Sequence, residues 1–182
     1  MRRFHFFRVR SCATVACTLG FLCCSLLWPQ YSGGADAGTP QVQLDAKKAA
    51  PRAVENLTER GIVRDYRVAW NNMAMALELN SVAPLDGPFT GEAKTSLWQS
   101  VISQQRSGLS RRYADQTHKL EAVFYALEGD AIELHDTADY QLQILDNGKV
   151  VQEEHVVAHY VVLMTPSSDR WLVRYLQAVP QF

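Results

Sequence analysis

The spacing of hydrophobic and polar positions along the chain changes near residue 110. Between residues 54 and 80, apolar side chains recur every three or four positions, which is the period of an amphipathic helix. A second pattern of this kind follows Thr90, a favourable N-cap residue, and ends near Gly108. The positions that define the apolar face of the first helix are Ile62, Tyr66, Trp70, Met73 and Leu77.

Beyond the second helix the apolar positions alternate with polar ones, which is typical of half-buried strands. Asn147-Gly148 lies between two alternating runs and is the strongest short-range signal for a β-hairpin. We therefore predict an α+β domain over residues 53–182, in which two helices pack on a curved four-stranded antiparallel meander. The predicted strands cover about 112–127, 131–145, 149–164 and 170–179.

The N-terminal part has a different composition. Residues 1–10 carry four arginines and no acidic residue, and residues 11–28 carry no charge. Basic followed by apolar is the order of a signal peptide or a signal anchor helix. If residues 35–37 (Ala-Asp-Ala) are a cleavage site, the N-terminal segment is removed. If they are not, residues 11–28 anchor the protein in a membrane. Residues 29–52, rich in Gly, Pro and Ala, are predicted to be a linker.

Charge and cysteine content narrow the class of protein. The chain has 18 Lys+Arg against 19 Asp+Glu, so without the four N-terminal arginines the rest is acidic. This argues against a nucleic acid as partner. All four cysteines lie within residues 11–28, which excludes a cysteine nucleophile or cysteine metal site in the domain itself. Because the arginines stay cytoplasmic, we expect the domain to be extracytoplasmic, either periplasmic or secreted.

The order of the elements resembles the nuclear transport factor 2-like superfamily, also called the cystatin-like or cone-shaped α+β fold. The likeness rests on two helices before a long meander, on Tyr66 and Trp70 in the first helix, and on Trp171 in the closing strand "RWLVRYLQAV". It looks most like the extracytoplasmic or membrane-tethered members. The resemblance implies an inner sheet face that lines a pocket, and it implies no single function, because the fold hosts enzymes, carriers and interaction modules.

Asp136 interrupts the apolar side of the second strand. A two-residue turn at Asn147-Gly148 pairs position 146 with 149, which places Asp136 opposite His159 on the inner face and Tyr140 opposite His155. A carboxylate that orients an imidazole can serve a general base. The same pair can instead be structural, or belong to a binding pocket lined by Tyr66, Trp70, Tyr140 and His155.

His155 and His159 have the i, i+4 spacing that holds zinc on a helix. The surrounding residues are rich in β-branched side chains and predict a strand, where the two rings lie about 13 Å apart at 3.3 Å per residue. We therefore expect no metal site, and no motif indicates a cofactor.

The same register sends Val156, Tyr160 and Val162 outward. An uncharged outward row of this kind predicts an interface with a second copy or an envelope protein, unless a different turn length makes it the core face. We expect a non-catalytic binding or assembly module of the cell envelope. The alternatives are a small hydrolyase- or isomerase-type enzyme that uses Asp136 and His159, and a carrier of a small apolar ligand.

Overall fold

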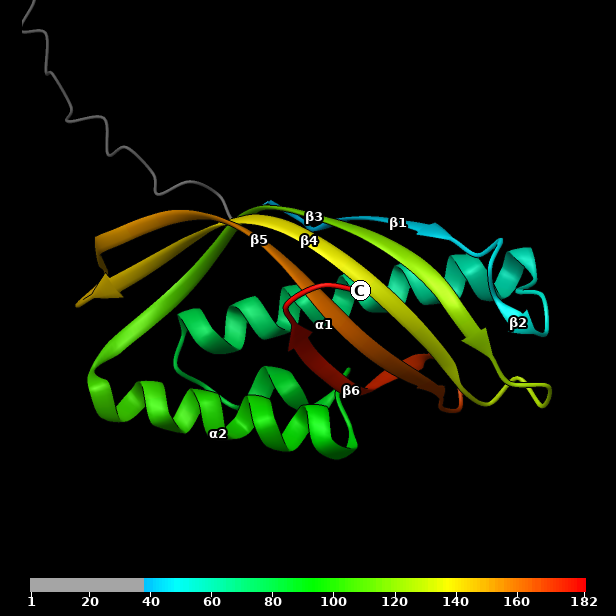
Figure 1. The fold of residues 1–182 in the computed structure, drawn as a ribbon. Coiled ribbons are helices and arrows are strands. Elements are labelled where there is room, and N and C mark those ends of the chain that lie inside the picture. The colour runs from blue at the N-terminus through cyan, green and yellow to red at the C-terminus, as the bar shows by residue number, and fades with distance from the viewer. Residues whose placement is uncertain (1–37) are drawn as a thin grey trace, which may run out of the picture. The chain divides into compact units, whose positions relative to one another are not determined.

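The computed structural model describes residues 38–182, which form one α+β unit with a strongly curved sheet (Figure 1). The predicted signal or anchor segment 1–28 and the first part of the predicted linker lie outside the described residues. Among the residues described, no helix has the length and the apolar character that spanning a bilayer requires. The elements in chain order are β1 (Gln41–Asp45), β2 (Ala50–Pro51), α1 (Asn56–Glu78), η1 (Ala83–Asp86), α2 (Gly91–Ser107), β3 (Leu109–Tyr125), β4 (Ile132–Asp146), β5 (Lys149–Pro166) and β6 (Trp171–Val179).

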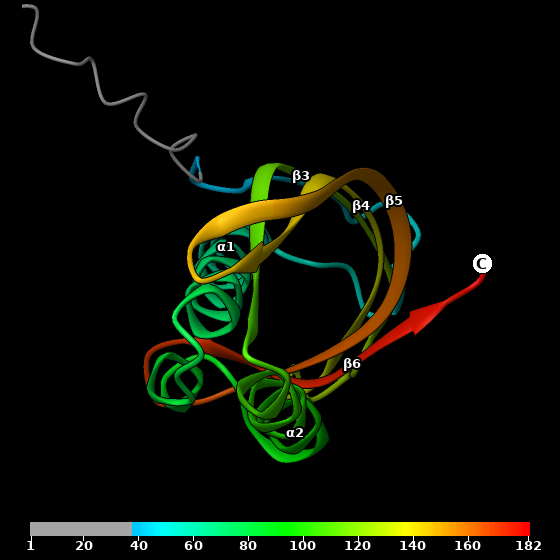
Figure 2. The same ribbon diagram turned by 90° about the vertical axis from the view of Figure 1, so that its left-hand side faces the viewer.

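Both predicted helices and all four predicted strands are confirmed. The predicted apolar face of α1 is buried at every position, from Ile62 to Leu77. The helix α2 begins after Thr90 and ends at Gly108, which takes the left-handed conformation (φ 72°) that favours glycine at this position. Figure 2 shows the curvature of β3, β4 and β5, with α1 and α2 on the concave side.

The linker prediction is wrong for the residues that form β1 and β2. The sheet is mixed and six-stranded, in the order β1-β3-β4-β5-β6, and β1 and β2 both pair with β3 in parallel. The residues of β1 alternate polar and apolar, so that Val42 is buried and Leu44 packs against the core. This short alternation is hidden by the Gly, Pro and Ala around it, whose composition is that of a linker.

The hairpin between β4 and β5 begins as predicted and then departs from the predicted register. Asn147 and Gly148 both have positive φ angles (48° and 76°), and 146 pairs with 149. Beyond Leu145 the register shifts, because Val151 is an extra residue in β5 without a partner in β4. Such a β-bulge reverses which side chains of a strand face inward.

The bulge overturns two predictions. Asp136 pairs with Tyr160 and not with His159, and Tyr140 pairs with Val156 and not with His155. The predicted interface row Val156, Tyr160 and Val162 therefore faces the core: Val162 is fully buried, and the other two pack against buried residues. The histidines at 155 and 159 lie on the outer face.

Candidate functional site

A polar cluster lies on the concave side of the sheet, in the interior between the sheet and α1. This interior is called the cone below. One carboxylate oxygen of Asp136, Oδ2, accepts a hydrogen bond of 2.7 Å from the hydroxyl of Tyr66. The same oxygen lies 2.8 Å from Nδ1 of His118. The side chains of His118 and Asp136 are both 0% exposed. A buried carboxylate needs such donors, because an unpaired charge away from water is very unfavourable.

The three residues come from three elements that the fold brings together. Tyr66 lies in the middle of α1, and the register of β3 and β4 pairs Leu120 with Asp136 and His118 with Ala138. His118 is therefore the diagonal neighbour of Asp136 on the same face, within reach of a side-chain contact. The register of β3 shifts between Ala114 and Thr117. Here too, an irregularity in a strand decides which side chains point into the cone.

Aromatic rings close the cluster on the remaining sides. The ring of Trp70 lies over that of His118, with 4.2 Å between centroids, and Tyr66 meets the same imidazole edge-on at 5.7 Å. Tyr160 packs edge-on against Trp70 at 5.4 Å, and its hydroxyl lies 3.1 Å from that of Tyr140. The space that a ligand would need in front of Asp136 is thus occupied by side chains of the protein.

Burial keeps the phenols of this interior neutral. It raises the pKa of Tyr66 well above its ordinary value, and the charge of Asp136 adds to the effect. Burial also raises the pKa of Tyr113 to about 12. The pKa values of Tyr140 and Tyr160 are raised as well, chiefly by burial. Tyr66 therefore donates to the carboxylate as a neutral hydroxyl, and the hydroxyls of Tyr140 and Tyr160 bond to one another in the same state.

The cluster has the chemical elements of an acid–base pair. A carboxylate bonded to Nδ1 of an imidazole fixes the ring's orientation and leaves Nε2 to exchange a proton. In the described residues, neither Nε2 of His118 nor the second oxygen of Asp136 has a hydrogen-bond partner. Both atoms are buried, so the pair has no path to solvent in this conformation.

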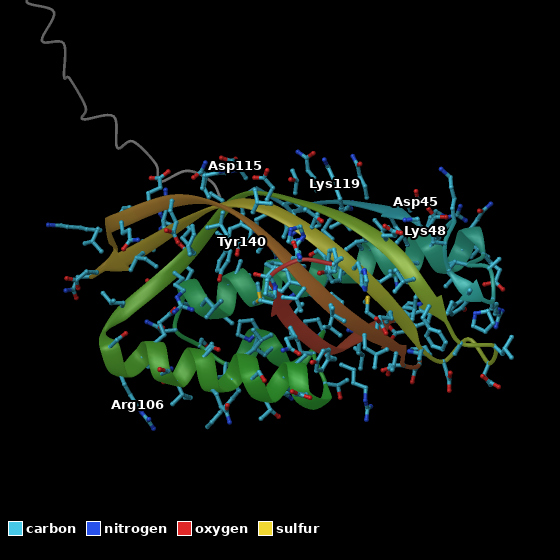
Figure 3. The ribbon with its side chains drawn as sticks, in the orientation of Figure 1. Asp45, Lys48, Arg106, Asp115, Lys119 and Tyr140 are labelled. Atoms are coloured by element: carbon cyan, nitrogen blue, oxygen red, sulfur yellow. The ribbon has the colours of Figure 1, made fainter. Side chains whose placement is uncertain are left out.

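The sequence located part of this cluster. Asp136, Tyr66, Trp70 and Tyr140 lie on the inner side as predicted; Figure 3 shows Tyr140 beneath the sheet, toward the helices. The sequence analysis did not identify His118 as a residue of this cluster. His118 is two residues before Leu120 and four before Ala122, both buried, and this spacing in a strand could have placed it on the inner face.

His155 was predicted to line the pocket and His159 to pair with Asp136. Both have surface contacts instead. His155 lies 2.7 Å from a carboxylate oxygen of Asp139, and both side chains are about half exposed. His159 lies 3.3 Å from the hydroxyl of Thr137, and its ring meets Phe182 edge-on. Within residues 38–182, no three histidine, aspartate or glutamate side chains are grouped as metal ligands would be.

Open space lies outside the cone. A groove of about 480 Å³ runs between α1, the η1 segment and the turn before β6. At its base, Asp65 binds the guanidinium of Arg64 through both oxygens and accepts a hydrogen bond of 2.8 Å from the backbone N–H of Trp171. Asp65 thereby joins α1 to β6. The residues around the groove are Arg64, Asp65, Val68, Asn72, Ala83, Pro84, Gly87, Pro88, Asp169, Arg170 and Trp171.

Comparison with known proteins shows the fold. No protein-family model and no curated protein matches the chain. Among solved structures, the intermembrane space region of the chloroplast protein ARC6 is 12% identical, with a TM-score of 0.55, and the match covers 71% of this chain and 98% of that one. A variant of Rv3472, a protein of unknown function from Mycobacterium tuberculosis, is 11% identical (TM-score 0.45; 70% and 77% covered). ActVI-ORFA from Streptomyces coelicolor is 12% identical (TM-score 0.44; 68% and 98% covered). The ARC6 match agrees with the nuclear transport factor 2-like fold that the order of the elements predicted.

Proposed function

We propose that residues 38–182 form a non-catalytic binding or assembly module that works outside the cytoplasm. The observation that carries the proposal is the filled interior. The inward side chains that would bind a substrate or ligand are at most 2% exposed at Tyr66, Trp70 and Asp136. Enzymes and carriers of small molecules hold their ligands in concave sites with access to solvent. The open surfaces of this domain lie on its outside.

An indole-binding experiment tests whether the interior is filled. Replacing the buried Trp70 by alanine should create an apolar cavity that takes up indole, since engineered cavities of this kind bind small aromatic molecules. We expect indole to raise the melting temperature of Trp70→Ala and to leave that of the wild-type protein unchanged. Trp98→Ala is the matched control, because Trp98 is 47% exposed on α2. Binding of indole by the wild-type protein would show an open pocket and contradict the proposal.

The extracytoplasmic location rests on the basic and then apolar order of residues 1–28. A reporter enzyme that is active only in an oxidising, exported compartment, fused after Phe182, should be active. Replacing Arg2, Arg3, Arg8 and Arg10 by glutamate in the same fusion should strongly reduce this activity, because the positive charges orient the segment. A fusion that is active only in the cytoplasm would refute the location.

A second candidate function has one observation in its favour. The unpaired Nε2 of His118 and the unpaired oxygen of Asp136 are the atoms that an acid–base enzyme of the hydrolyase or isomerase type would use. Diethyl pyrocarbonate, which modifies accessible imidazoles, separates the two functions. The module predicts rapid modification of the exposed His155 and none of His118 in the folded protein. Modification of both at similar rates would show that the cone opens, and would favour the enzyme.

A further inference from the structure

The first half of β5 is an open strand edge. The strand β6 pairs only with the part of β5 from His159 to Pro166, although β5 begins at Lys149. Pro180 follows directly after β6 and has no backbone N–H to continue the ladder. Within residues 38–182, the segment 149–158 thus has β4 on one side and no strand on the other, over roughly 30 Å at 3.3 Å per residue.

Nothing in the described part of the chain covers this edge. The backbone of β5 comes close only to β4 and β6, and no helix lies against it. Figure 1 shows the β4–β5 hairpin at one end of the sheet, away from β6. In an antiparallel strand, alternate residues direct both their N–H and C=O groups to the same side. The open edge therefore presents a row of donors and acceptors, the template on which an added strand pairs.

The side chains along the edge indicate the chemistry of the strand that would fit. Three valines are strongly exposed here: Val150 (45%), Val151 (60%) and Val157 (56%). Between them lie Glu153 and Glu154, both exposed and on opposite faces of the strand. An added strand would cover apolar surface at both ends of the edge and meet negative charge on either face in the middle.

From this arrangement we infer that residues 149–158 bind an extended segment of a partner protein as an additional strand, and that this segment carries two adjacent basic residues flanked by apolar ones. The inference rests on the proposed function as a binding module and names the class of partner. Lysine or arginine opposite Glu153 and Glu154 is favourable, whereas like charges directly across a sheet are destabilising. The acidic pair disfavours pairing with acidic strands, because the like charges would repel one another across the sheet.

A peptide-binding experiment tests the inference. The probe is a short synthetic peptide in which two adjacent lysines lie between valines, and the control peptide has two glutamates in place of the lysines. On saturation with the probe, hydrogen exchange of the amides in residues 150–158 should slow by about tenfold or more, because outward N–H groups become hydrogen-bonded. The control peptide should give no protection. Protection elsewhere, or binding without protection of this segment, would refute strand addition at β5.

Matched variants test the charge requirement. The double variant Glu153→Lys/Glu154→Lys should bind the valine–lysine probe at least about tenfold more weakly and should gain affinity for the valine–glutamate peptide. Glu128→Lys/Asp130→Lys changes the net charge equally in the turn between β3 and β4, and should bind like the wild type. Equal weakening in both double variants would mean non-specific charge attraction and would overturn the proposal.

Self-association is measured on the wild-type protein without peptide. If residues 150–158 become protected with rising protein concentration while light scattering reports a dimer, the occupant of the edge is a second copy, and the inference about a basic partner is wrong. These outcomes do not depend on the indole experiment. A filled cone with no peptide binding would refute the edge inference alone, whereas an open cone would refute the proposed function.

Discussion

Asp136 is a fully buried carboxylate that depends on two donors from other elements, Tyr66 and His118. We expect Asp136→Asn to lower the free energy of unfolding by about 1–3 kcal/mol, because an amide supplies one acceptor oxygen fewer and leaves a buried donor poorly paired. Urea unfolding measures this. Asp139→Asn is the matched control, since the Asp139–His155 pair is at the surface, where ion pairs contribute about 0–1 kcal/mol. An equal decrease in the free energy of unfolding in the two variants would show that the buried cluster stabilises the fold no more than a surface ion pair does.

The buried tyrosines predict a fall in stability at alkaline pH. The folded-state pKa of Tyr113 is raised to about 12 from 10.0, so the folded protein holds this proton more tightly than the unfolded chain does. The unfolded chain ionises first as the pH rises, so stability present below pH 10 is lost between about pH 10 and 12. The raised pKa values of Tyr66, Tyr140 and Tyr160 act in the same direction.

Urea unfolding at several alkaline pH values measures this loss. Each buried phenol should contribute a slope of about 1.4 kcal/mol per pH unit between the two pKa values. Tyr113→Phe should make the slope shallower, whereas Tyr175→Phe, whose hydroxyl bonds Gln177 at the surface, should leave it unchanged. A wild-type slope that Tyr113→Phe does not alter would contradict the assignment.

At the scale of elements, the bulge in β5 decides which face of the strand meets the core. We expect Val162→Asp to prevent folding, because it places an unpaired charge where the side chain is fully buried. Val157→Lys, on the same strand but on the outer face opposite Asp139, should change the free energy of unfolding by no more than about 0.5 kcal/mol. Circular dichroism and urea unfolding compare the two. A folded Val162→Asp together with an unfolded Val157→Lys would mean that the strand has the register predicted without the bulge.

At the scale of the whole molecule, β1 and β2 cover the outer edge of β3. A chain that begins at Ala53, the domain boundary predicted from the sequence, would expose that edge and lose the buried Val42. We expect it to melt several degrees below a chain that begins at Gly38 and to aggregate more readily on heating, since an unpaired edge invites pairing with other chains. Differential scanning fluorimetry with light scattering tests this. Identical melting and scattering would show that the first strands contribute nothing to the domain.

The sequence predicted those features that depend on local period and on turn chemistry. The apolar spacing of α1 identified its buried face, including Tyr66 and Trp70, and the Asn147-Gly148 turn was placed correctly. Alternation also placed Asp136 on the inner face of β4. It could not name the partner of Asp136, because a contact between strands depends on the register of both.

By itself, then, the sequence determined the order of the two helices and the four long strands, the core face of α1 and the side on which Asp136 lies, because these follow from spacing within one segment. Only the tertiary structure decided that His118 binds Asp136, that Tyr160 faces inward and that β1 and β2 belong to the sheet. Tyr160 faces inward because one extra residue, Val151, reverses the faces of β5, and the contact of His118 with Asp136 depends on the register between β3 and β4. The pairing of β1 with β3 likewise joins segments more than 70 residues apart in the chain, beyond the reach of any local pattern.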